Sequence, residues 1–209
     1  MISNRVADNR LGPVKDDLLL ALRRIQLNLD AYREDPHDLT SLEAVLEAID
    51  QIRGPLVVLD HREACALLED LRVLISALKI ANTLERIGDL AKNIAKRALI
   101  LAESEPMQPL TRSIERMGRL VSNRLRDVLD AYTASEIERA LSVWQTDDEV
   151  DEHYNALFRE LLTYMMGDPR TITACTHLLF MAKNLERIGD HATNIAETVH
   201  YEITGEDML

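Results

Sequence analysis

The strongest constraint on the fold of this chain is a short phrase of sequence that occurs twice. Residues 84–95 read LERIGDLAKNIA and residues 185–196 read LERIGDHATNIA, so 10 of 12 positions are identical at an offset of 101 residues. A second repeat, LDAY, begins at Leu29 and again at Leu129, at an offset of 100 residues. Two repeats at almost one offset indicate that a unit of about a hundred residues has been duplicated.

Each copy of the unit has the composition and spacing of helices. Leu, Ala, Glu and Arg are frequent, whereas the 209 residues include only 7 Gly and 6 Pro, which favours an all-α fold. Apolar residues recur every three or four positions, as at Leu84, Ile87 and Ala91. We expect helices over residues 14–33, 39–53, 62–103, 110–133, 135–165 and 170–203.

The breaks between these helices are predicted from proline and glycine. Asp35-Pro36 ends the first helix, Gly54-Pro55 the second, and Gly167-Asp168-Pro169 the fifth. Glu105-Pro106 and Gln108-Pro109 separate the two copies. The prediction is therefore two tandem three-helix bundles, over residues 1–105, whose N-terminal part is degenerate, and residues 106–209.

The repeated phrase places acidic and amide side chains on one stripe of a helix, because residues four apart lie on the same face. Like charges at this spacing destabilise a helix by roughly 0.2–0.5 kcal/mol, which a bound cation would offset. A solvated polar face or an ion pair with a neighbouring helix is the simpler explanation of one such motif. The stripe residues are Glu85, Asp89 and Asn93 in the first copy and Glu186, Asp190 and Asn194 in the second.

The second copy offers a partner for its stripe. Asp147 and Asp151 are also four residues apart, in the predicted fifth helix. If the fifth and sixth helices are antiparallel neighbours, two carboxylate pairs face each other. Such hard oxygen ligands suit Mg²⁺, Mn²⁺, Ca²⁺ or iron. His191 is expected to be a polar surface residue or a neighbour of the ligands.

The first copy lacks an equivalent partner pair. The offset of 101 places Leu46 and Asp50 opposite the second-copy aspartates, and the offset of 100 places Glu47 and Gln51 there, so one carboxylate is missing either way. Two lysines on its stripe can neutralise the acids without a metal; these are Lys92 and Lys96. We therefore expect metal in the second bundle rather than in the first.

The charge and the cysteine content limit the classes of function and the cellular compartments that fit this chain. The formal net charge is -12 and no dense basic stripe occurs, which argues against nucleic-acid binding. Cys65 and Cys175 have no zinc-type spacing and are expected to be small core residues in a reducing compartment. No basic segment followed by an apolar run opens the chain, so we expect a cytoplasmic protein.

The repeated phrase and the residues before each copy resemble those of a known family. LERIGDLAKNIAKR, LERIGDHATNIAE and the approaches ALKIANTLERIGD and HLLFMAKNLERIGD are similar to the signature phrases of the PhoU family. The resemblance implies two three-helix bundles and a cytoplasmic accessory protein of the phosphate ABC transporter. It implies a negative regulator of the phosphate-starvation response that links a PstB-like ATPase to a PhoR-like sensor histidine kinase. Such proteins commonly form homodimers and meet the membrane only through their partners.

The resemblance also implies metal ligands, including multinuclear iron, at paired acidic motifs. Carried over, these are Asp147, Asp151, Glu186 and Asp190, with Asn194 nearby, and more weakly Glu85, Asp89 and Asn93. The ion is iron, manganese, zinc or magnesium, and the sequence leaves its identity open. It also leaves open whether the chain is the ordinary regulator of its organism or a specialised paralogue.

Two other functions remain open at the sequence level. A ferritin-like metalloenzyme needs a Glu-x-x-His motif on each of two helices. The chain has Glu197-x-x-His200 on a predicted helix, but its other instance, Glu34 to His37, contains Pro36. No catalytic residue is therefore proposed. The second alternative is a helical adaptor that binds no metal.

Overall fold

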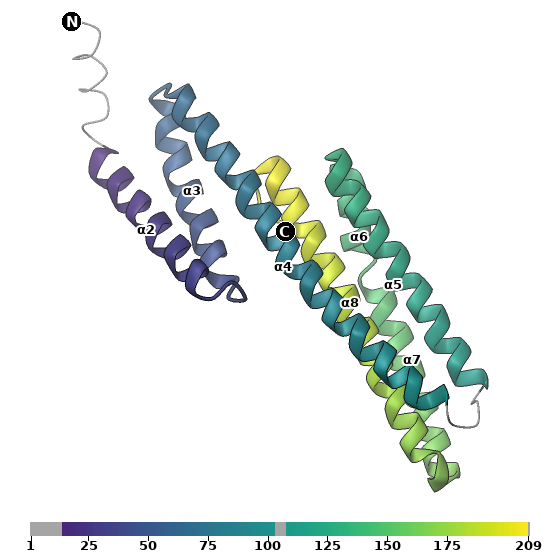
Figure 1. The fold of residues 1–209 in the computed structure, drawn as a ribbon. Helices are drawn as coiled ribbons and strands as arrows, with labels where there is room; N and C mark the ends of the chain where they lie inside the picture. The colour runs from purple at the N-terminus through teal and green to yellow at the C-terminus, as the bar shows by residue number, and fades with distance from the viewer. Residues whose placement is uncertain (1–13, 103–107, 209) are drawn as a thin grey trace, which may run out of the picture. The chain divides into compact units, whose positions relative to one another are not determined.

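The structure is a computed structural model that describes residues 14–102 and 108–208. No strand occurs in these residues, so the predicted all-α fold is confirmed. Within the same residues, no helix combines the length and the apolar composition that crossing a membrane requires. In chain order the helices are α2 (Lys15–Glu34), α3 (Thr40–Val58), α4 (Arg62–Ala102), α5 (Gln108–Ala134), α6 (Ile137–Gln145), α7 (Asp148–Gly167), the short 3-10 helix η2 (Pro169–Thr171) and α8 (Ile172–Thr204) (Figure 1).

The chain forms two compact units that divide between Asn82 and Thr83, inside α4. The first unit contains α2, α3 and the first half of α4, and the second contains the remainder, which agrees with two tandem helical bundles. The sequence-based boundary at residues 105 and 106 stays a prediction. The predicted end of the third helix at residue 103 and the break at Glu105-Pro106 lie outside the described residues.

In the first unit, α2 packs against α3, and the apolar face of α3 forms most of the core. Leu42, Val45 and Ile49 on α3 and Ile75 on α4 are all fully buried. Asn82 on α4 donates a hydrogen bond to the backbone carbonyl of Pro36, which ties α4 to the turn between α2 and α3.

The second predicted helix does not end at Gly54-Pro55. α3 continues through Pro55 to Val58, which corrects the prediction. Proline leaves the carbonyl of the residue four positions earlier without its helical partner, and that residue, Gln51, is exposed, so water can satisfy the carbonyl. The additional turn buries Leu56, which favours its formation.

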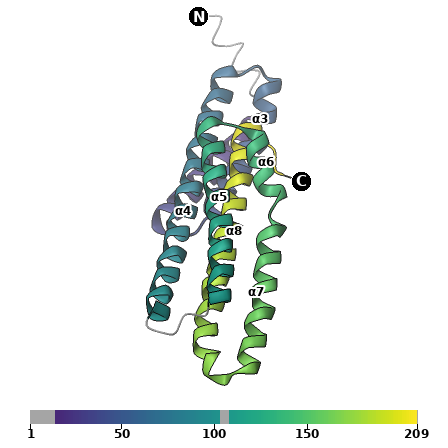
Figure 2. The ribbon, with the colours of Figure 1, turned by 90° about the vertical axis from the view of Figure 1, so that its right-hand side faces the viewer.

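In the second unit, α8 lies at the centre and contacts α5, α6 and α7. Figure 2 shows α6 and α7 following one another along α8. The predicted break at Gly167-Asp168-Pro169 is confirmed, because α7 ends at Gly167 and Pro169 begins η2. The side of α8 that faces these helices carries a buried stripe formed by Cys175, Leu178, Ala182, Leu185, Ile188, Ala192, Ile195 and Val199.

The fifth predicted helix is two helices rather than one, which is a second correction. α6 ends at Gln145 and α7 begins at Asp148. The Thr146 hydroxyl donates to the carbonyl oxygens of Ser142 and Val143, so it binds the end of its own helix. The following residue, Asp147, makes contacts with α5 and α8 that fix the junction and are described below.

Candidate metal centre

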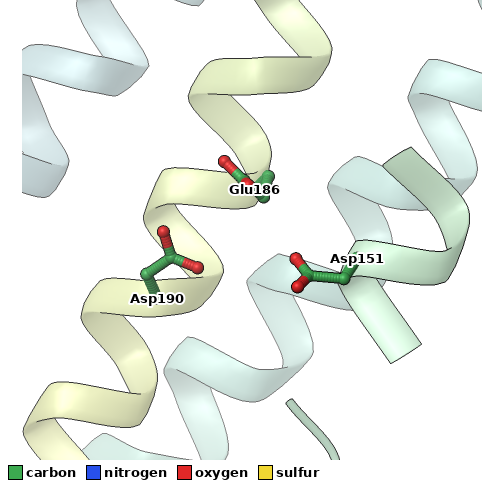
Figure 3. A group of neighbouring side chains, drawn as sticks. All are labelled: Asp151, Glu186 and Asp190. Carbon is green, nitrogen blue, oxygen red and sulfur yellow. The ribbon is translucent and has the colours of Figure 1, made fainter. Parts of the chain in front are cut away.

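Three carboxylates from α7 and α8 gather in the second unit. Asp151, Glu186 and Asp190 each offer an oxygen atom, and these atoms all lie within 4.8 Å of one another. Figure 3 shows Glu186 and Asp190 one helical turn apart on α8, with Asp151 reaching toward them from α7. The structure thus brings together three of the acidic residues that the sequence selected from two separate motifs.

A glycine allows α7 to approach α8 closely beside these carboxylates. A Cβ atom on Gly189 would lie 3.3 Å from Cγ1 of Val150, closer than ordinary van der Waals contact. Val150 is buried, and it is the neighbour in sequence of Asp151 just as Gly189 is of Asp190. The glycine of the repeated phrase therefore sets the spacing between the two helices at the site.

Glu186 is the most protected of the three carboxylates, with a side chain that is only 12% exposed. Its Oε1 atom accepts a hydrogen bond from Nζ of Lys183, whereas its Oε2 atom is buried and has no hydrogen-bond partner among the described residues. A buried oxygen without a partner is costly, and a cation or a water molecule would satisfy it. The donor set of hard oxygens and this orphaned atom together fit a divalent metal ion.

The clustering of acids changes their protonation. Local desolvation raises the pKa of Asp190 to about 6, although the residue as a whole is exposed, and the charges of Glu186, Asp147 and Asp151 add to the rise. The pKa of Asp151 is raised for the same reasons, desolvation first, while the charge of Lys183 opposes the rise. Repulsion of this kind indicates a site that gains from a bound cation.

Asp147, the fourth carboxylate predicted from the sequence, lies beside the cluster but is engaged by the protein itself. Its Oδ1 atom accepts a hydrogen bond of 2.7 Å from the hydroxyl of Thr193 on α8. The same oxygen lies 3.7 Å from the guanidinium of Arg124 on α5. Asp147 therefore joins α5, the α6–α7 junction and α8, and its charge still acts on Asp190.

Arg124 is the residue of this site that the sequence analysis missed. Its side chain is only 5% exposed and lies 3.9 Å from Glu149. Within the part of the chain that the structure describes, its Nε and Nη2 atoms make no hydrogen bond. Burial lowers the pKa of Arg124, and the charges of Asp147, Glu149 and Asp151 oppose that effect. The sequence carried a signal, because Arg124 occupies a core position in the apolar stripe Leu110, Ile114, Met117, Val121, Val128 and Ala131.

Asn194, the amide predicted near the ligands, lines a cavity of about 450 Å³ that extends from Asp190 toward α6. Trp144 borders this cavity, and its Nε1 atom donates to Glu197 at 3.2 Å. The lining is acidic and includes Asp190 of the cluster, so an ion can reach that carboxylate from solvent. The lining residues are Trp144, Gln145, Asp147, Asp148, Asp190, Thr193, Asn194 and Glu197.

The first copy of the phrase is arranged differently. Glu85, Asp89 and Asn93 are exposed on α4, and Nζ of Lys92 lies 3.9 Å from Asp89. Among the described residues, the group of three close carboxylates does not include either first-copy acid. His191, in the second copy, is half-buried, and desolvation followed by the charges of Arg86 and Arg187 lowers its pKa.

Comparison with known proteins agrees with both copies of the unit. The family model of the PhoU domain matches residues 31–98 and 114–199. The PhoU homolog of Caulobacter vibrioides NA1000, a phosphate-specific transport system accessory protein, is 73% identical over 139 residues, which cover 66% of this chain and 60% of that protein. The corresponding homolog of Rhizobium meliloti is 43% identical over 200 residues, which cover 96% of this chain and 78% of that protein.

A solved structure agrees as well. The crystal structure of PhoU from Pseudomonas aeruginosa has a TM-score of 0.60 and 34% identity, and the match covers 95% of this chain and 99% of that one. Both halves of the duplicated sequence, the helical architecture and the relatives lead to one assignment. The chain belongs to the PhoU family.

Proposed function

We propose that this chain is a non-catalytic accessory and regulatory protein of phosphate transport. Its role would be to repress the phosphate-starvation response while phosphate is plentiful, by linking the phosphate ABC transporter to a sensor histidine kinase. The observation that carries the proposal is the match to the PhoU domain over both repeats. The names of two relatives support it. The homolog of Caulobacter vibrioides is a phosphate-specific transport system accessory protein, and the PhoU of Streptococcus pneumoniae is a phosphate transport system regulatory protein.

The partners that we propose are a PstB-like transporter ATPase, a PhoR-like kinase and a second copy of the chain. The protein would act in the cytoplasm and reach the membrane only through these partners. Exposed apolar residues on α2 support a role in protein contacts, because large apolar side chains that face solvent mark interaction surfaces. They are Leu19, Leu20, Leu22 and Leu27.

The metal function that we propose is structural or modulatory. Asp151, Glu186 and Asp190 would hold an ion of iron, manganese, zinc or magnesium, with Asp147 and Asn194 close by. When bound, the ion would supply positive charge that joins α7 to α8 and removes the repulsion between their carboxylates. The first-copy residues Glu85, Asp89 and Asn93 are the weaker candidates, because Lys92 already lies beside Asp89.

The placement of the one Glu-x-x-His motif on α8 favours this proposal over a ferritin-like enzyme. Glu197 accepts a hydrogen bond from Trp144, and Nδ1 of His200 lies 3.0 Å from the carbonyl oxygen of Glu206. Neither belongs to the cluster of three carboxylates. An adaptor that binds no metal is the remaining alternative, and Lys183 and Arg124 provide it with internal counter-charges.

The proposal is tested by deleting the gene and measuring starvation-gene expression in phosphate-rich medium. We expect derepression, with repression restored by the native gene. Complementation with Asp151→Asn combined with Asp190→Asn then asks whether the metal site contributes. Unchanged expression after deletion would contradict the regulatory role, whereas full complementation by the double variant would contradict a modulatory role of the metal only.

A further inference from the structure

A lysine lies at the edge of the three-carboxylate cluster, one turn before Glu186 on α8. The ammonium of Lys183 donates a hydrogen bond to Oε1 of Glu186 and lies 5.2 Å from the centre of the Tyr154 ring on α7. The lysine side chain is 49% exposed, whereas that of Glu186 is 12% exposed. The carboxylate is therefore fixed in a protected position, and the ammonium is free to leave it for solvent.

Arg124, another cation of this region, pairs with acids outside the three-carboxylate cluster. Arg124 is buried below Asp147 and Glu149 and contacts neither Glu186 nor Asp190 within ion-pair distance. Lys183 thus binds one of the three clustered carboxylates directly. Its charge also reaches the other two, since it opposes the repulsion felt by both Asp151 and Asp190.

We propose that Lys183 is a built-in competitor of the metal ion: its ammonium neutralises Glu186 in the ion-free protein and withdraws toward Tyr154 and solvent when an ion binds. The proposal rests on the metal function proposed above for Asp151, Glu186 and Asp190. Two cations a few ångströms apart repel each other strongly in a partly buried site, so the ammonium and the ion cannot share Glu186 without loss of affinity.

The ring of Tyr154 can bind the ammonium of Lys183 after the ion displaces it from Glu186. The face of a tyrosine attracts a cation within about 6 Å of the ring centroid, and Tyr154 is already at that range. Three ionised carboxylates carry three negative charges, of which Lys183 neutralises one in the ion-free protein, whereas a divalent ion neutralises two. A site of this kind exchanges its ion more readily than one without the lysine.

The test is a calorimetric titration of the chelator-treated full-length chain with Mn²⁺. We expect Lys183→Met to bind Mn²⁺ roughly tenfold more tightly than the native chain, because one repelling charge has been removed. Lys183→Arg retains the charge and is expected to bind with near-native affinity. Arg119→Met removes one charge from an exposed i,i+4 ion pair with Glu115 on α5, and serves as the control for net charge.

The outcomes separate this inference from the metal function itself. If the native chain binds Mn²⁺ and Lys183→Met binds it equally or less tightly, the competitor role is wrong and the metal site stands. If only Lys183→Met binds Mn²⁺, the lysine competes successfully and the native chain is a metal-free adaptor. If neither binds, both proposals fail. Lys183→Gln provides a second neutral variant should the methionine perturb folding, which circular dichroism would reveal.

Discussion

Asp190 holds its proton more tightly than a carboxyl group in water, because it is partly desolvated and because other carboxylates surround it. A pKa raised from 3.8 to about 6 means that the ionised form is disfavoured in the folded chain. The stability linked to this group is fully present below pH 4 and is lost as the pH rises through about 6. At neutral pH the ion-free protein therefore carries an internal repulsion.

Asp190→Asn removes both the desolvation of an ionised carboxylate and its repulsion by the neighbouring acids. We expect the ion-free variant to be more stable than the native chain at pH 8 by about 1 kcal/mol, a value reduced for the exposure of the residue. The difference shrinks as the pH falls from 6 toward 4 and disappears well below pH 4, where Asp190 is protonated in both the folded and the unfolded state. Urea denaturation at several pH values, with chelator present, measures it. A variant that is less stable at pH 8 would contradict the electrostatic account.

Arg124 is the second residue whose environment dictates a measurable effect. A charge that is almost fully buried depends on its partners, here Asp147 and Glu149, and removing one member leaves the others without compensation. Because both acids remain partly solvated, we expect Arg124→Met to cost about 2 kcal/mol rather than the full penalty of a buried pair. Arg119→Met, at an exposed pair on the same helix, is expected to change the free energy of unfolding by less than about 0.5 kcal/mol.

At the scale of the elements, the two glycines of the repeated phrase form a matched pair. Among the residues that the structure describes, a Cβ on Gly88 in α4 would meet no atom within 4 Å, whereas one on Gly189 in α8 would meet Val150 of α7. Gly88→Ala is expected to stabilise the chain by about 0.5–1 kcal/mol through helix propensity. Gly189→Ala is expected to destabilise it by about 1 kcal/mol, because overpacking outweighs the same gain.

Thermal unfolding of the two alanine variants compares them directly. Gly189→Ala should also weaken Mn²⁺ binding, since it moves Asp151 away from Glu186 and Asp190. Gly88→Ala should leave Mn²⁺ binding unchanged. Equal effects of the two substitutions on either measurement would mean that the close approach of α7 to α8 has no part in forming the site.

The ends of four helices agree closely with the sequence-based expectation. α2, α4 where it is described, α5 and α8 end within two residues of the expected positions. The failures have identifiable causes. Pro55 does not end α3, because the carbonyl of Gln51 that it leaves without a helical partner is at an exposed residue. The α6–α7 break depends on Arg124 and Thr193, which are distant in sequence.

The candidate site was predictable to the extent that helical spacing determines it. Spacing places Glu186 and Asp190 on one face, and the antiparallel pairing of two helices brings Asp151 opposite them. Spacing alone does not reveal that Asp147 is occupied by Thr193 and Arg124, since these contacts arise only from three-dimensional packing. Whether the whole set binds metal stays a prediction.

A ligand that binds only the folded state stabilises the entire folded chain by mass action. With Mn²⁺ at a hundred times its dissociation constant, we expect the free energy of unfolding to rise by about 2.7 kcal/mol. Asp151→Asn combined with Glu186→Gln should abolish this stabilisation, whereas Glu85→Gln combined with Asp89→Asn should retain it. Thermal shift with and without Mn²⁺ checks both; a response lost only in the first-copy variant would place the metal in the first copy.

The two nearly identical phrases have a consequence for how the chain can vary. Gly189 lies against Val150 and Asp190 faces Asp151, whereas a Cβ on Gly88 would contact no described residue within 4 Å. A saturating library over both phrases, selected for phosphate-dependent repression, should therefore show unequal tolerance. Substitutions at Gly88 and Asp89 would persist at frequencies typical of a helix surface. Those at Gly189 and Asp190 would be depleted, although the two copies have identical residues at these positions.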